Sequence, residues 1–292
     1  MLDLSEHFRP ATAQPFMKTL HYSEISPCEA LKPYIRCFWG TVLPGCQPIF
    51  SDERKSLVIP DGCMDIIFRG DLAKSSIDAY FCGLDENGWQ SASEQFSGGF
   101  TFTFGVRFYL WAAGAFVSDT LSGSAGQGIA AEALFPGFVR EMSEFLRRGL
   151  TLHENAKFAE VILLRGILRQ PDDDIMNSLE FMLSRQGRVT LAELMLHTGC
   201  TAKRLQRLFG GNIGASPKSV MSVIRYQLMW QEMLRTGSFS ALDAVERYGY
   251  YDQAHLLHDF KRRHLMTPQA ALELAKSGSS PNERCEVLNG KT

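Results

Sequence analysis

The sequence lacks the long apolar stretches that mark membrane and secreted proteins. No segment approaches the roughly 18 uncharged apolar residues that a transmembrane helix needs. The first residues, MLDLSEHFRPATAQPFMK, carry charged side chains throughout and no apolar signal-peptide core. We therefore expect a cytoplasmic protein that makes no contact with a membrane.

Clustered metal ligands and catalytic groups are also missing. The cysteines are scattered and form no C-x-x-C pair, so neither a zinc ribbon nor a thioredoxin-type site is expected. Only His7 and His21 precede His153, which argues against the metal site of a barrel enzyme. No Ser/His/Asp or Cys/His arrangement can be assembled from the chain. We expect a protein that is not an enzyme and that needs no metal or cofactor. The seven cysteines are Cys28, Cys37, Cys46, Cys63, Cys82, Cys200 and Cys285.

A strong net charge is absent as well, but the average conceals a division. The chain has 30 Lys and Arg against 32 Asp and Glu, a formal charge of −2 that by itself disfavours a nucleic-acid binder. Residues 185–276 carry 13 basic and 7 acidic side chains, a balance of +6, and the remainder has a balance of −8. A basic module near the C-terminus of an acidic body indicates an anionic partner for that module.

The length of 292 residues and the 45% share of hydrophobic residues favour a soluble globular protein of about two domains. Residues 20–110 are rich in short aromatic and β-branched runs separated by turn residues. Asp61-Gly62 is the strongest short turn signal, and FTFTFGVRF alternates apolar with polar residues. This pattern predicts a small β-barrel or sandwich. The expected strands are 34–42, 56–60, 64–68, 77–84 and 100–108.

Residues 130–169 follow with helical periodicity. Apolar side chains recur at helical spacing over 132–148 and 153–169, and Gly149 can end the first of these helices. We expect an αα-hairpin that either covers the barrel or presents an apolar stripe for dimerisation. Gln170-Pro171 begins a linker, and the pattern is helical from there to about residue 275. The predicted domains are 1–170 and 171–276, with a mobile tail at 277–292.

A helix–turn–helix is indicated at residues 190–210. Thr190 and Glu193 form a capping box, and Gly199 can supply the left-handed end of the first helix. Thr201 then caps a helix whose apolar back leaves Lys203, Gln206 and Arg207 on its front. Such a front suits the major groove of DNA, since Arg can bridge guanine and Gln can bridge adenine.

A second unit of the same design lies about 50 residues further on. Ser240 caps a helix that ends at Gly249, and Asp252 caps the next helix, whose outer face continues into the run KRR at 261–263. Between the units, Pro217 stands in the first turn of a long helix that reaches Leu234. Two equivalent units joined by one helix are much stronger evidence for DNA binding than one.

The predicted domain 171–276 resembles, over about a hundred residues, the DNA-binding domain of the AraC/XylS family of bacterial transcription regulators. LAELMLHTGCTAKRLQRLF, GASPKSVMSVIR and AVERYGYYDQAHLLHDFKR are similar to the family's two units and their connection, and Thr267-Pro268 matches its closing Thr-Pro. The resemblance implies two recognition helices that enter successive major-groove segments. The sequence departs from the family pattern at Val245, Leu256, His258, Leu265, Ala271 and Leu272. The residues expected to contact DNA are Thr201, Lys203, Arg204, Gln206, Arg207, Asp252, Gln253, Ala254, Leu257, His258, Lys261 and Arg262.

The N-terminal region resembles, more loosely, the effector domains of this family, which are small cupin-like β-barrels followed by two dimerising helices. The resemblance implies an effector-binding homodimer that contacts RNA polymerase. Candidate effector contacts combine aromatic surface or charge with a strand or turn position. Arg107 leads them, because a charge within an apolar strand needs a partner. These candidates are Trp39, Asp61, Asp65, Trp89, Phe102, Phe104 and Arg107.

The sequence therefore predicts an α+β protein with a barrel domain and an all-helical domain of two helix–turn–helix units. Its expected function is effector-responsive transcription regulation on double-stranded DNA. Two alternatives remain open. One is a regulator without a small ligand, controlled by thiol oxidation or protein contact. The other is a DNA-repair alkyl acceptor fused to a DNA-binding module, with Cys63 as the acceptor.

Overall fold

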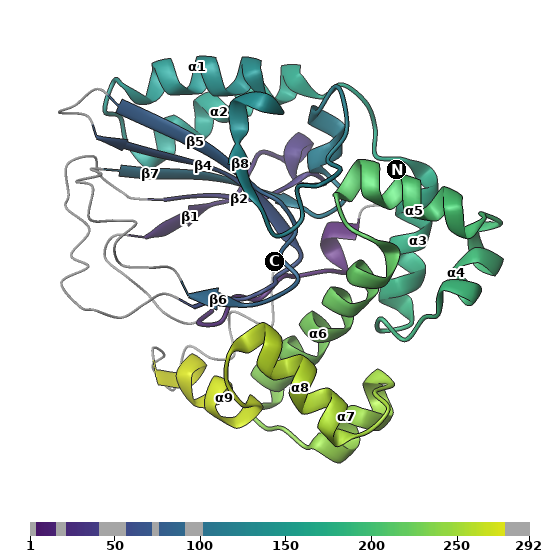
Figure 1. The fold of residues 1–292 in the computed structure, drawn as a ribbon. Coiled ribbons are helices and arrows are strands. Elements are labelled where there is room, and N and C mark those ends of the chain that lie inside the picture. Colours follow the sequence, from purple (N-terminus) through teal and green to yellow (C-terminus); the bar gives the residue numbers. More distant parts are fainter. Residues whose placement is uncertain (1–3, 16–21, 41–56, 72–75, 91–101, 278–292) are drawn as a thin grey trace.

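The computed structural model describes residues 4–15, 22–40, 57–71, 76–90 and 102–277. Cys46, Cys285 and the predicted tail beyond Ser277 lie outside these residues. The described chain begins with a strand-rich region and ends with a wholly helical one (Figure 1). This confirms the prediction of a two-part α+β fold.

The strand-rich region is built on one antiparallel six-stranded sheet. Its order is β1-β2-β7-β4-β5-β8, and a small second sheet pairs β3 with β6. Among the described residues the larger sheet is open, with β1 and β8 as its edges, so the expected closed barrel is not confirmed. The strands are β1 (Ser23–Ile25), β2 (Ile35–Gly40), β3 (Leu57–Val58), β4 (Cys63–Asp71), β5 (Ser76–Cys82), β6 (Trp89–Gln90), β7 (Phe102–Tyr109) and β8 (Gly128–Ala130).

The turn signal at Asp61-Gly62 corresponds to a real turn, but the two flanking strands do not pair with each other. Gly62 has a φ of +78°, a conformation that glycine adopts without strain. The strand before it, β3, pairs with β6, whereas β4 lies between β5 and β7. The long registers of β4 with its two neighbours outweigh a local hairpin to the two-residue β3.

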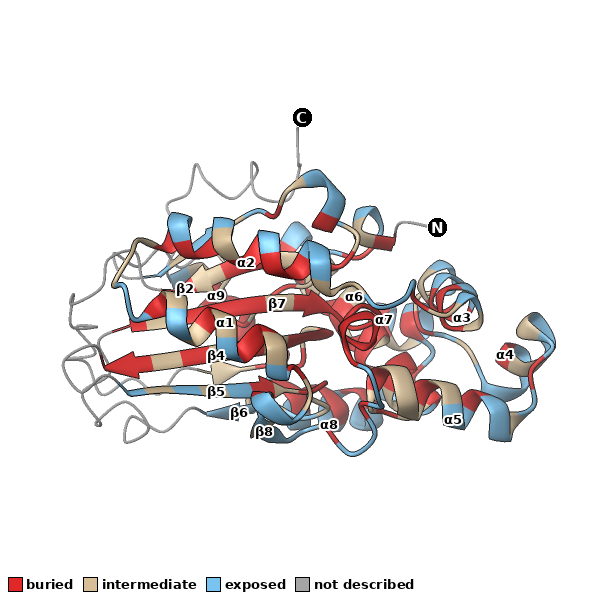
Figure 2. Ribbon diagram, turned by 90° about the horizontal axis from the view of Figure 1, so that it is seen from above, coloured by how far each residue is buried: buried red, intermediate tan, exposed pale blue. Residues whose placement is uncertain are grey.

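The two faces of the sheet differ in chemistry, because side chains alternate along each strand. On one face phenylalanines fill the core, where Phe68 packs against Phe138 and Phe81 packs against Phe135. Helices α1 (Pro136–Leu146) and α2 (Leu152–Gly166) cover this face and turn their buried residues toward it (Figure 2). Near Phe102 the described residues leave a cavity of only about 10 Å³ on this face, and a second hollow of about 350 Å³ lies between β5 and α1, where Ile77, Val139 and Arg140 line it. The opposite face carries polar residues, including Arg107.

The helical region contains both predicted helix–turn–helix units. Helices α4 and α5 form the first unit, α6 is the connecting helix, and α7 and α8 form the second. The predicted caps are all present: Thr190, Thr201, Ser240 and Asp252 each accept a backbone N–H of the helix that follows. The helices are α3 (Asp173–Ser184), α4 (Leu191–Thr198), α5 (Ala202–Ile213), α6 (Pro217–Thr236), α7 (Ala241–Tyr248), α8 (Gln253–His264) and α9 (Pro268–Ser277).

Candidate nucleic-acid interface and interdomain cavity

The first candidate reading surface is the exposed front of α5. Leu205 and Phe209 are fully buried and fix the orientation of the helix. Lys203, Gln206 and Arg207 are exposed on the other side, as the periodicity predicts. The helix therefore presents a basic and amide-bearing face to solvent.

Arg204, beside that face, already has a partner in the described structure. Its Nε and Nη2 donate to Oδ2 of Asp174 on α3, at 3.1 and 2.5 Å. These hydrogen bonds to Asp174, together with its negative charge, raise the pKa of the Arg204 guanidinium. Arg204 is thus held against α3, while Arg207 has no such contact among the described residues.

The second candidate reading surface lies on α8. Leu256 and Phe260 are fully buried, which turns the opposite side of the helix to solvent. The exposed residues of α8 are Gln253, Ala254, His255, Leu257, His258, Lys261 and Arg262. These include every residue of this helix that the sequence assigned to DNA contact. Thr201 and Asp252 stand exposed at the starts of α5 and α8, where they cap the helices.

The interpretation of 261–263 as one outer run is wrong at Arg263. This side chain is 1% exposed, and its Nη1 donates to the carbonyl oxygen of Glu86 at 2.7 Å. Its Nη2 donates to Ser222 Oγ at 2.6 Å, and its Nε contacts the Asp259 carboxylate at 3.3 Å. Arg263 therefore joins α8 to α6 and to the strand-rich region.

One departure from the family pattern lies at the end of α8. Leu265 is the C-cap of α8 and has a φ of +57°, in the left-handed region that glycine adopts most easily. The sequence places Leu where the family usually has Gly. The backbone at this position keeps the conformation that the glycine would favour, and it carries the strain of a side chain there.

Helix α6 holds the two units together. Its 20 residues span about 30 Å, comparable with the roughly 34 Å of one DNA turn. Val220, Tyr226 and Trp230 are fully buried along it. A buried and unbroken helix restricts the relative motion of α5 and α8.

The strand-rich region also holds the C-terminal ends of both candidate reading helices. Leu121 N–H donates to the carbonyl oxygen of Gly211 on α5 at 2.8 Å, and Ser122 Oγ donates to that of Gly210 at 3.2 Å. Gly88 N–H donates to the carbonyl oxygen of Arg262 on α8 at 3.2 Å. Both helices are therefore fixed from behind, while their fronts stay exposed.

Residues 4–15 connect the same two regions through α6. The Gln227 side chain accepts a hydrogen bond from Ala11 N–H at 2.9 Å and donates to the carbonyl oxygen of Pro60 at 2.7 Å. Trp230 Nε1 donates to the carbonyl oxygen of Thr12 at 3.0 Å. Gln227 is fully buried and has lost its hydrogen bonds to water, so these bonds are needed to satisfy its polar atoms.

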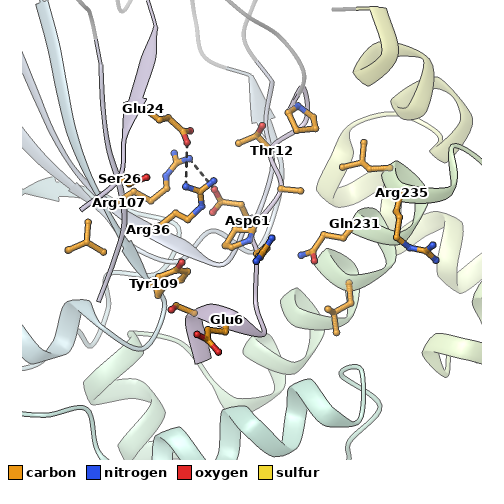
Figure 3. A pocket seen from close by; sticks show the side chains of 18 of the residues that line it. Glu6, Thr12, Glu24, Ser26, Arg36, Asp61, Arg107, Tyr109, Gln231 and Arg235 are labelled. Atoms are coloured by element: carbon orange, nitrogen blue, oxygen red, sulfur yellow. Dashed lines mark hydrogen bonds and ion pairs between the residues drawn. The ribbon is translucent and has the colours of Figure 1, made fainter. Parts of the chain in front are cut away.

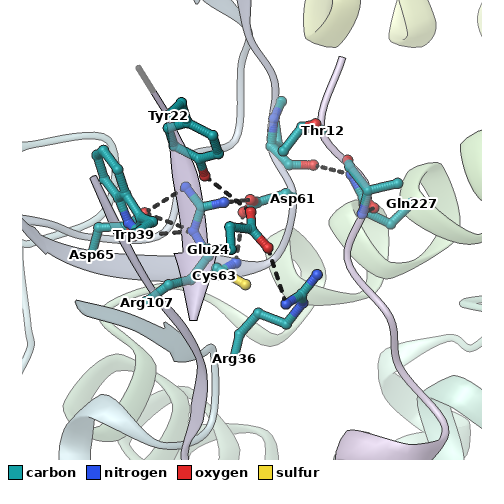
Figure 4. Close-up of polar contacts among 12 residues, drawn as sticks. Thr12, Tyr22, Glu24, Arg36, Trp39, Asp61, Cys63, Asp65, Arg107 and Gln227 are labelled. Carbon is teal, nitrogen blue, oxygen red and sulfur yellow. Dashed lines mark hydrogen bonds and ion pairs between the residues drawn. The ribbon is translucent and has the colours of Figure 1, made fainter. Parts of the chain in front are cut away.

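Four of the predicted effector contacts meet on the polar face of the sheet (Figure 4). Arg107 on β7 donates to both carboxylate oxygens of Asp65 on β4, with Nε at 3.0 Å from Oδ1 and Nη2 at 3.2 Å from Oδ2. Trp39 Nε1 donates to Asp65 Oδ1 at 2.7 Å, and its ring lies against the guanidinium, 5.6 Å from ring centre to Arg107 Cζ. Asp61 Oδ2 lies 3.6 Å from Arg107 Nη1.

Burial governs the charges of this cluster. It raises the pKa of Asp61, an effect that the Arg107 charge opposes and the Asp65 charge reinforces. Burial alone would lower the pKa of Arg107, but the charges of Asp65 and Asp61 raise it well above its usual value. The arginine therefore stays protonated between two carboxylates.

A cavity of about 1050 Å³ opens beside this cluster, between the polar face of the sheet and the helical region (Figure 3). Asp61, Arg107 and Tyr109 line it from the strand-rich region. Gln231 and Arg235 line it from α6. Residues from the two regions thus share one cavity.

The other predicted effector contacts lie elsewhere. Phe102 and Phe104 point into the helix-covered core and are buried. Trp89 on β6 is 39% exposed and donates to Asp85 at 3.1 Å. Burial raises the pKa of Asp85 to about 6. Sequence reasoning missed Tyr22, Tyr109 and Gln231, which line the cavity; strand parity shared with Arg107 could have indicated Tyr109.

Three of the described cysteines, Cys37, Cys63 and Cys82, offer little thiolate. Burial raises the pKa of Cys37 to about 12 and that of Cys63 well above its ordinary value. It also raises the pKa of Cys82 to about 12. A nucleophilic or redox-sensing thiol needs the opposite shift, so these positions disfavour both the thiol switch and the alkyl acceptor. Within the described ranges no three His, Cys, Asp or Glu side chains are grouped to hold a metal ion. In the same residues, we find no helix with the length and apolar character required to cross a membrane.

Comparison with known proteins matches two segments of the chain. Residues 23–129 match a family described as a domain of unknown function (DUF6597), and residues 194–273 match a helix-turn-helix domain family. No curated protein matches the chain.

Among solved structures, the chain is similar to ToxT from Vibrio cholerae, with 10% identity, a TM-score of 0.39, and coverage of 81% of this chain and 98% of ToxT. It is similar also to ToxT from Vibrio cholerae O395 bound to (E)-4-(8-methylnaphthalen-1-yl)but-3-enoic acid. That comparison gives 10% identity, a TM-score of 0.38, and coverage of 87% and 98% of the two chains. The family match at 194–273 coincides with the two helix–turn–helix units, which confirms the resemblance found in the sequence. This region is an AraC-type helix–turn–helix domain, and the chain that carries it is a DNA-binding transcription regulator.

Proposed function

We propose that this regulator recognises an operator by placing α5 and α8 in successive major-groove segments, and that its strand-rich region senses a small molecule. The observation that supports the DNA mode is the pair of exposed helix fronts whose backs and C-terminal ends are fixed. Fixed helices lose little freedom on binding, which favours affinity. We assign the DNA contacts to the residues named from the sequence on α5 and α8.

Arg207 is the residue we expect to contribute most to base reading by α5. It is exposed and is not paired among the described residues, so its guanidinium is available for bidentate contact with guanine. Arg204 would have to leave Asp174 before contacting DNA. The two neighbouring arginines are therefore expected to differ in their effect.

Replacing Arg207 by Ala is expected to weaken specific operator binding by roughly 1–3 kcal/mol. The measurement is a fluorescence anisotropy titration at fixed salt, with a duplex that the wild-type protein selects from a random pool. Arg204→Ala should weaken operator binding less than Arg207→Ala does. Arg140→Ala, which removes an exposed arginine from α1, should leave operator affinity unchanged. Equal operator affinity of Arg207→Ala and Arg140→Ala would contradict the assignment.

The contacts between the two regions provide a physical route from sensing to DNA binding. A movement of the strand-rich region would pull on Gly210, Gly211 and Arg262, whose carbonyls it holds. Both candidate reading helices would then shift or loosen together. The docked arrangement leaves both fronts exposed, so we infer that it is the form competent for DNA.

Gly88→Ala tests this route. A Cβ at Gly88 would lie 2.1 Å from the carbonyl oxygen of Arg263, a backbone atom that cannot move aside alone. Such a clash costs roughly 1–3 kcal/mol, so we expect α8 to undock and operator affinity to fall by up to about 150-fold. Gly128→Ala is the matched control, because nothing lies within 4 Å of its added Cβ. If the two variants bind the operator equally well, the docked form is not the DNA-competent one.

We also propose that the protein works as a homodimer, as the sequence resemblance implies. Exposed apolar side chains at the end of α2 and just after it support this proposal: Val161 and Leu164 on the helix and Leu168 beyond it are 54%, 43% and 59% exposed. Grouped exposed apolar side chains are typical of association surfaces. Recruitment of RNA polymerase remains part of the proposal as well.

A further inference from the structure

The shared cavity is the place in the described structure where a small molecule could contact both regions at once. The cavities beside the helix-covered face are smaller, about 10 and 350 Å³, and α1, α2 and the sheet line them, whereas the polar face borders a cavity of about 1050 Å³. Ligand pockets in proteins typically occupy about 300–1,000 Å³. The position of the cavity, rather than its size alone, makes it suited to sensing, because its walls belong to two parts of the chain.

Asp61 is the charged group of this wall with incomplete hydrogen bonding. Its side chain is 15% exposed, and its Oδ1 accepts the Cys63 N–H at 2.9 Å. Its Oδ2 has the Arg107 Nη1 at 3.6 Å, too long for a good hydrogen bond. The arginine is committed instead to Asp65, on which it makes three closer contacts. One buried cation thus serves two carboxylates, and a charge of −1 is left over at the cavity wall.

The other charges around the cavity are largely paired within the protein. Arg36 lies 3.4 Å from Glu24, and Lys32 lies 2.5 Å from Glu29. On the helical side, Glu232 is paired with Arg247 and accepts the Tyr248 hydroxyl hydrogen bond. Glu6, Arg9 and Arg235 also line the cavity, but all three are exposed at its rim, where Arg235 lies 3.8 Å from Glu232. The uncompensated charge nearest the interior is therefore negative.

The remaining walls combine aromatic rings with an amide. Tyr22 and Tyr109 line the side formed by the sheet, and Tyr22 lies 5.9 Å from Trp39, ring centre to ring centre. Figure 3 shows Gln231 of α6 directed into the cavity opposite Asp61. A flat ring could lie against the tyrosines, whose faces attract cations. The amide of Gln231 could contact the end of such a ligand that lies farthest from Asp61.

We propose that this cavity binds a small organic cation, such as an amidinium or ammonium group on an aromatic body, with the positive group on the Asp61 carboxylate. This deepens the proposed function and rests on it, since it identifies the sensed molecule by its chemistry. The cation supplies the hydrogen bond that Oδ2 lacks and balances the excess charge. Its aromatic body reaches Gln231 and so links the strand-rich region to α6.

The test uses the full-length protein and three probes of one shape: benzamidine, benzamide and benzoate. They are cationic, neutral and anionic, so differences among them report charge rather than size. We expect benzamidine to raise the melting temperature and to bind in calorimetric titration, with benzamide at least tenfold weaker and benzoate weaker still. Tighter binding of benzamide or benzoate, or no binding of benzamidine at millimolar concentration, would overturn the proposal.

Two variants locate the binding. Asp61→Asn removes the negative charge, while its amide oxygen can still accept the hydrogen bond from Cys63 N–H. This variant should bind benzamidine at least tenfold more weakly. Gln231→Arg places a tethered guanidinium in the cavity from half-buried α6 and should block benzamidine even if Asp61→Asn folds poorly. Glu144→Gln removes an exposed carboxylate on α1 and should leave affinity unchanged.

A separate measurement of operator binding by the wild-type protein distinguishes a failure of the proposed ligand class from a failure of the proposed DNA-binding function. Loss of benzamidine binding alone refutes the ligand class. Failure to bind any selected DNA refutes the proposed function.

Discussion

Replacing Arg263 by Met is expected to lower the free energy of unfolding by about 3–5 kcal/mol, the range for breaking a buried ion pair on one side. The guanidinium is almost completely buried and contacts Asp259, Ser222 and the carbonyl of Glu86. Met keeps most of the apolar stem but leaves the buried Asp259 carboxylate without its main counter-charge. Chemical denaturation followed by circular dichroism provides the measurement.

Asp259 shows why this pair is costly to break. Burial alone would raise its pKa, but the Arg263 charge and hydrogen bonds from Arg262, Arg263 and Tyr250 together lower it. The carboxylate is therefore ionised in a site from which water is excluded, and removal of Arg263 removes most of its stabilisation.

Arg262→Ala is the matched control, one residue earlier on the same helix. Arg262 also donates to Asp259, at 2.7 Å, but its side chain is 44% exposed. Exposed pairs contribute about 0–1 kcal/mol, so a small loss is expected. If Arg263→Met were no more destabilised than Arg262→Ala, the network would not be a structural link between α8, α6 and the strand-rich region.

The sequence predicted the helix–turn–helix units well because their signals are local. Thr190, Thr201, Ser240 and Asp252 each bond a backbone N–H three residues on, so the cap and its partner stand in one short segment. The left-handed Gly199 is equally local. No long-range contact is needed to recognise such boundaries.

Arg263 shows where local reasoning fails. Its place in a basic run at a helix end indicated a solvated side chain, and its buried position depends on Glu86, 177 residues away in the chain. One signal was available: Arg263 follows Leu256 and Phe260 at spacings of seven and three, so it shares their buried face. Helical position outweighed residue type.

The candidate effector site was predictable in composition but not in arrangement. Alternation along β7 separates Phe104 from Arg107, and so divides the filled face from the polar one. The pairing of Arg107 with Asp65 depends on the register of β7 with β4, which no local pattern encodes. Closure of the sheet into a barrel likewise depends on strand pairing, so local patterns could not establish it, and the described residues do not confirm it. The cavity required, in addition, the docking of α6, which only the folded chain reveals.

Acidification is expected to destabilise the protein through His264. This ring is fully buried between α6 and α8, and burial lowers its pKa from 6.5 to about 3. Its Nδ1 lies 2.7 Å from the Tyr226 hydroxyl, and its ring stacks on Phe260 at 4.9 Å between centres. Among the described residues, Nε2 has no hydrogen-bond partner. The site therefore accommodates the neutral imidazole.

The direction of this effect on stability follows from the number of protons that the folded and the unfolded chain bind. Between pH 6.5 and 3 the unfolded chain protonates this histidine while the folded protein does not, so stability falls as the pH falls. The shift predicts that the free energy of unfolding is about 2 kcal/mol lower at pH 5 than at neutral pH, and that this loss increases toward pH 3. Denaturation midpoints across this pH range measure the loss.

The double variant Tyr226→Phe/His264→Phe tests the assignment to His264. It removes both the titrating ring and the Tyr226 hydroxyl that would otherwise be left unpaired, and it should lose this part of the pH dependence. His153→Gln, at an exposed position on α2, should retain it. Equal acid sensitivity of the wild type and the double variant would show that other groups, and not the buried His264, control stability between pH 6.5 and 5.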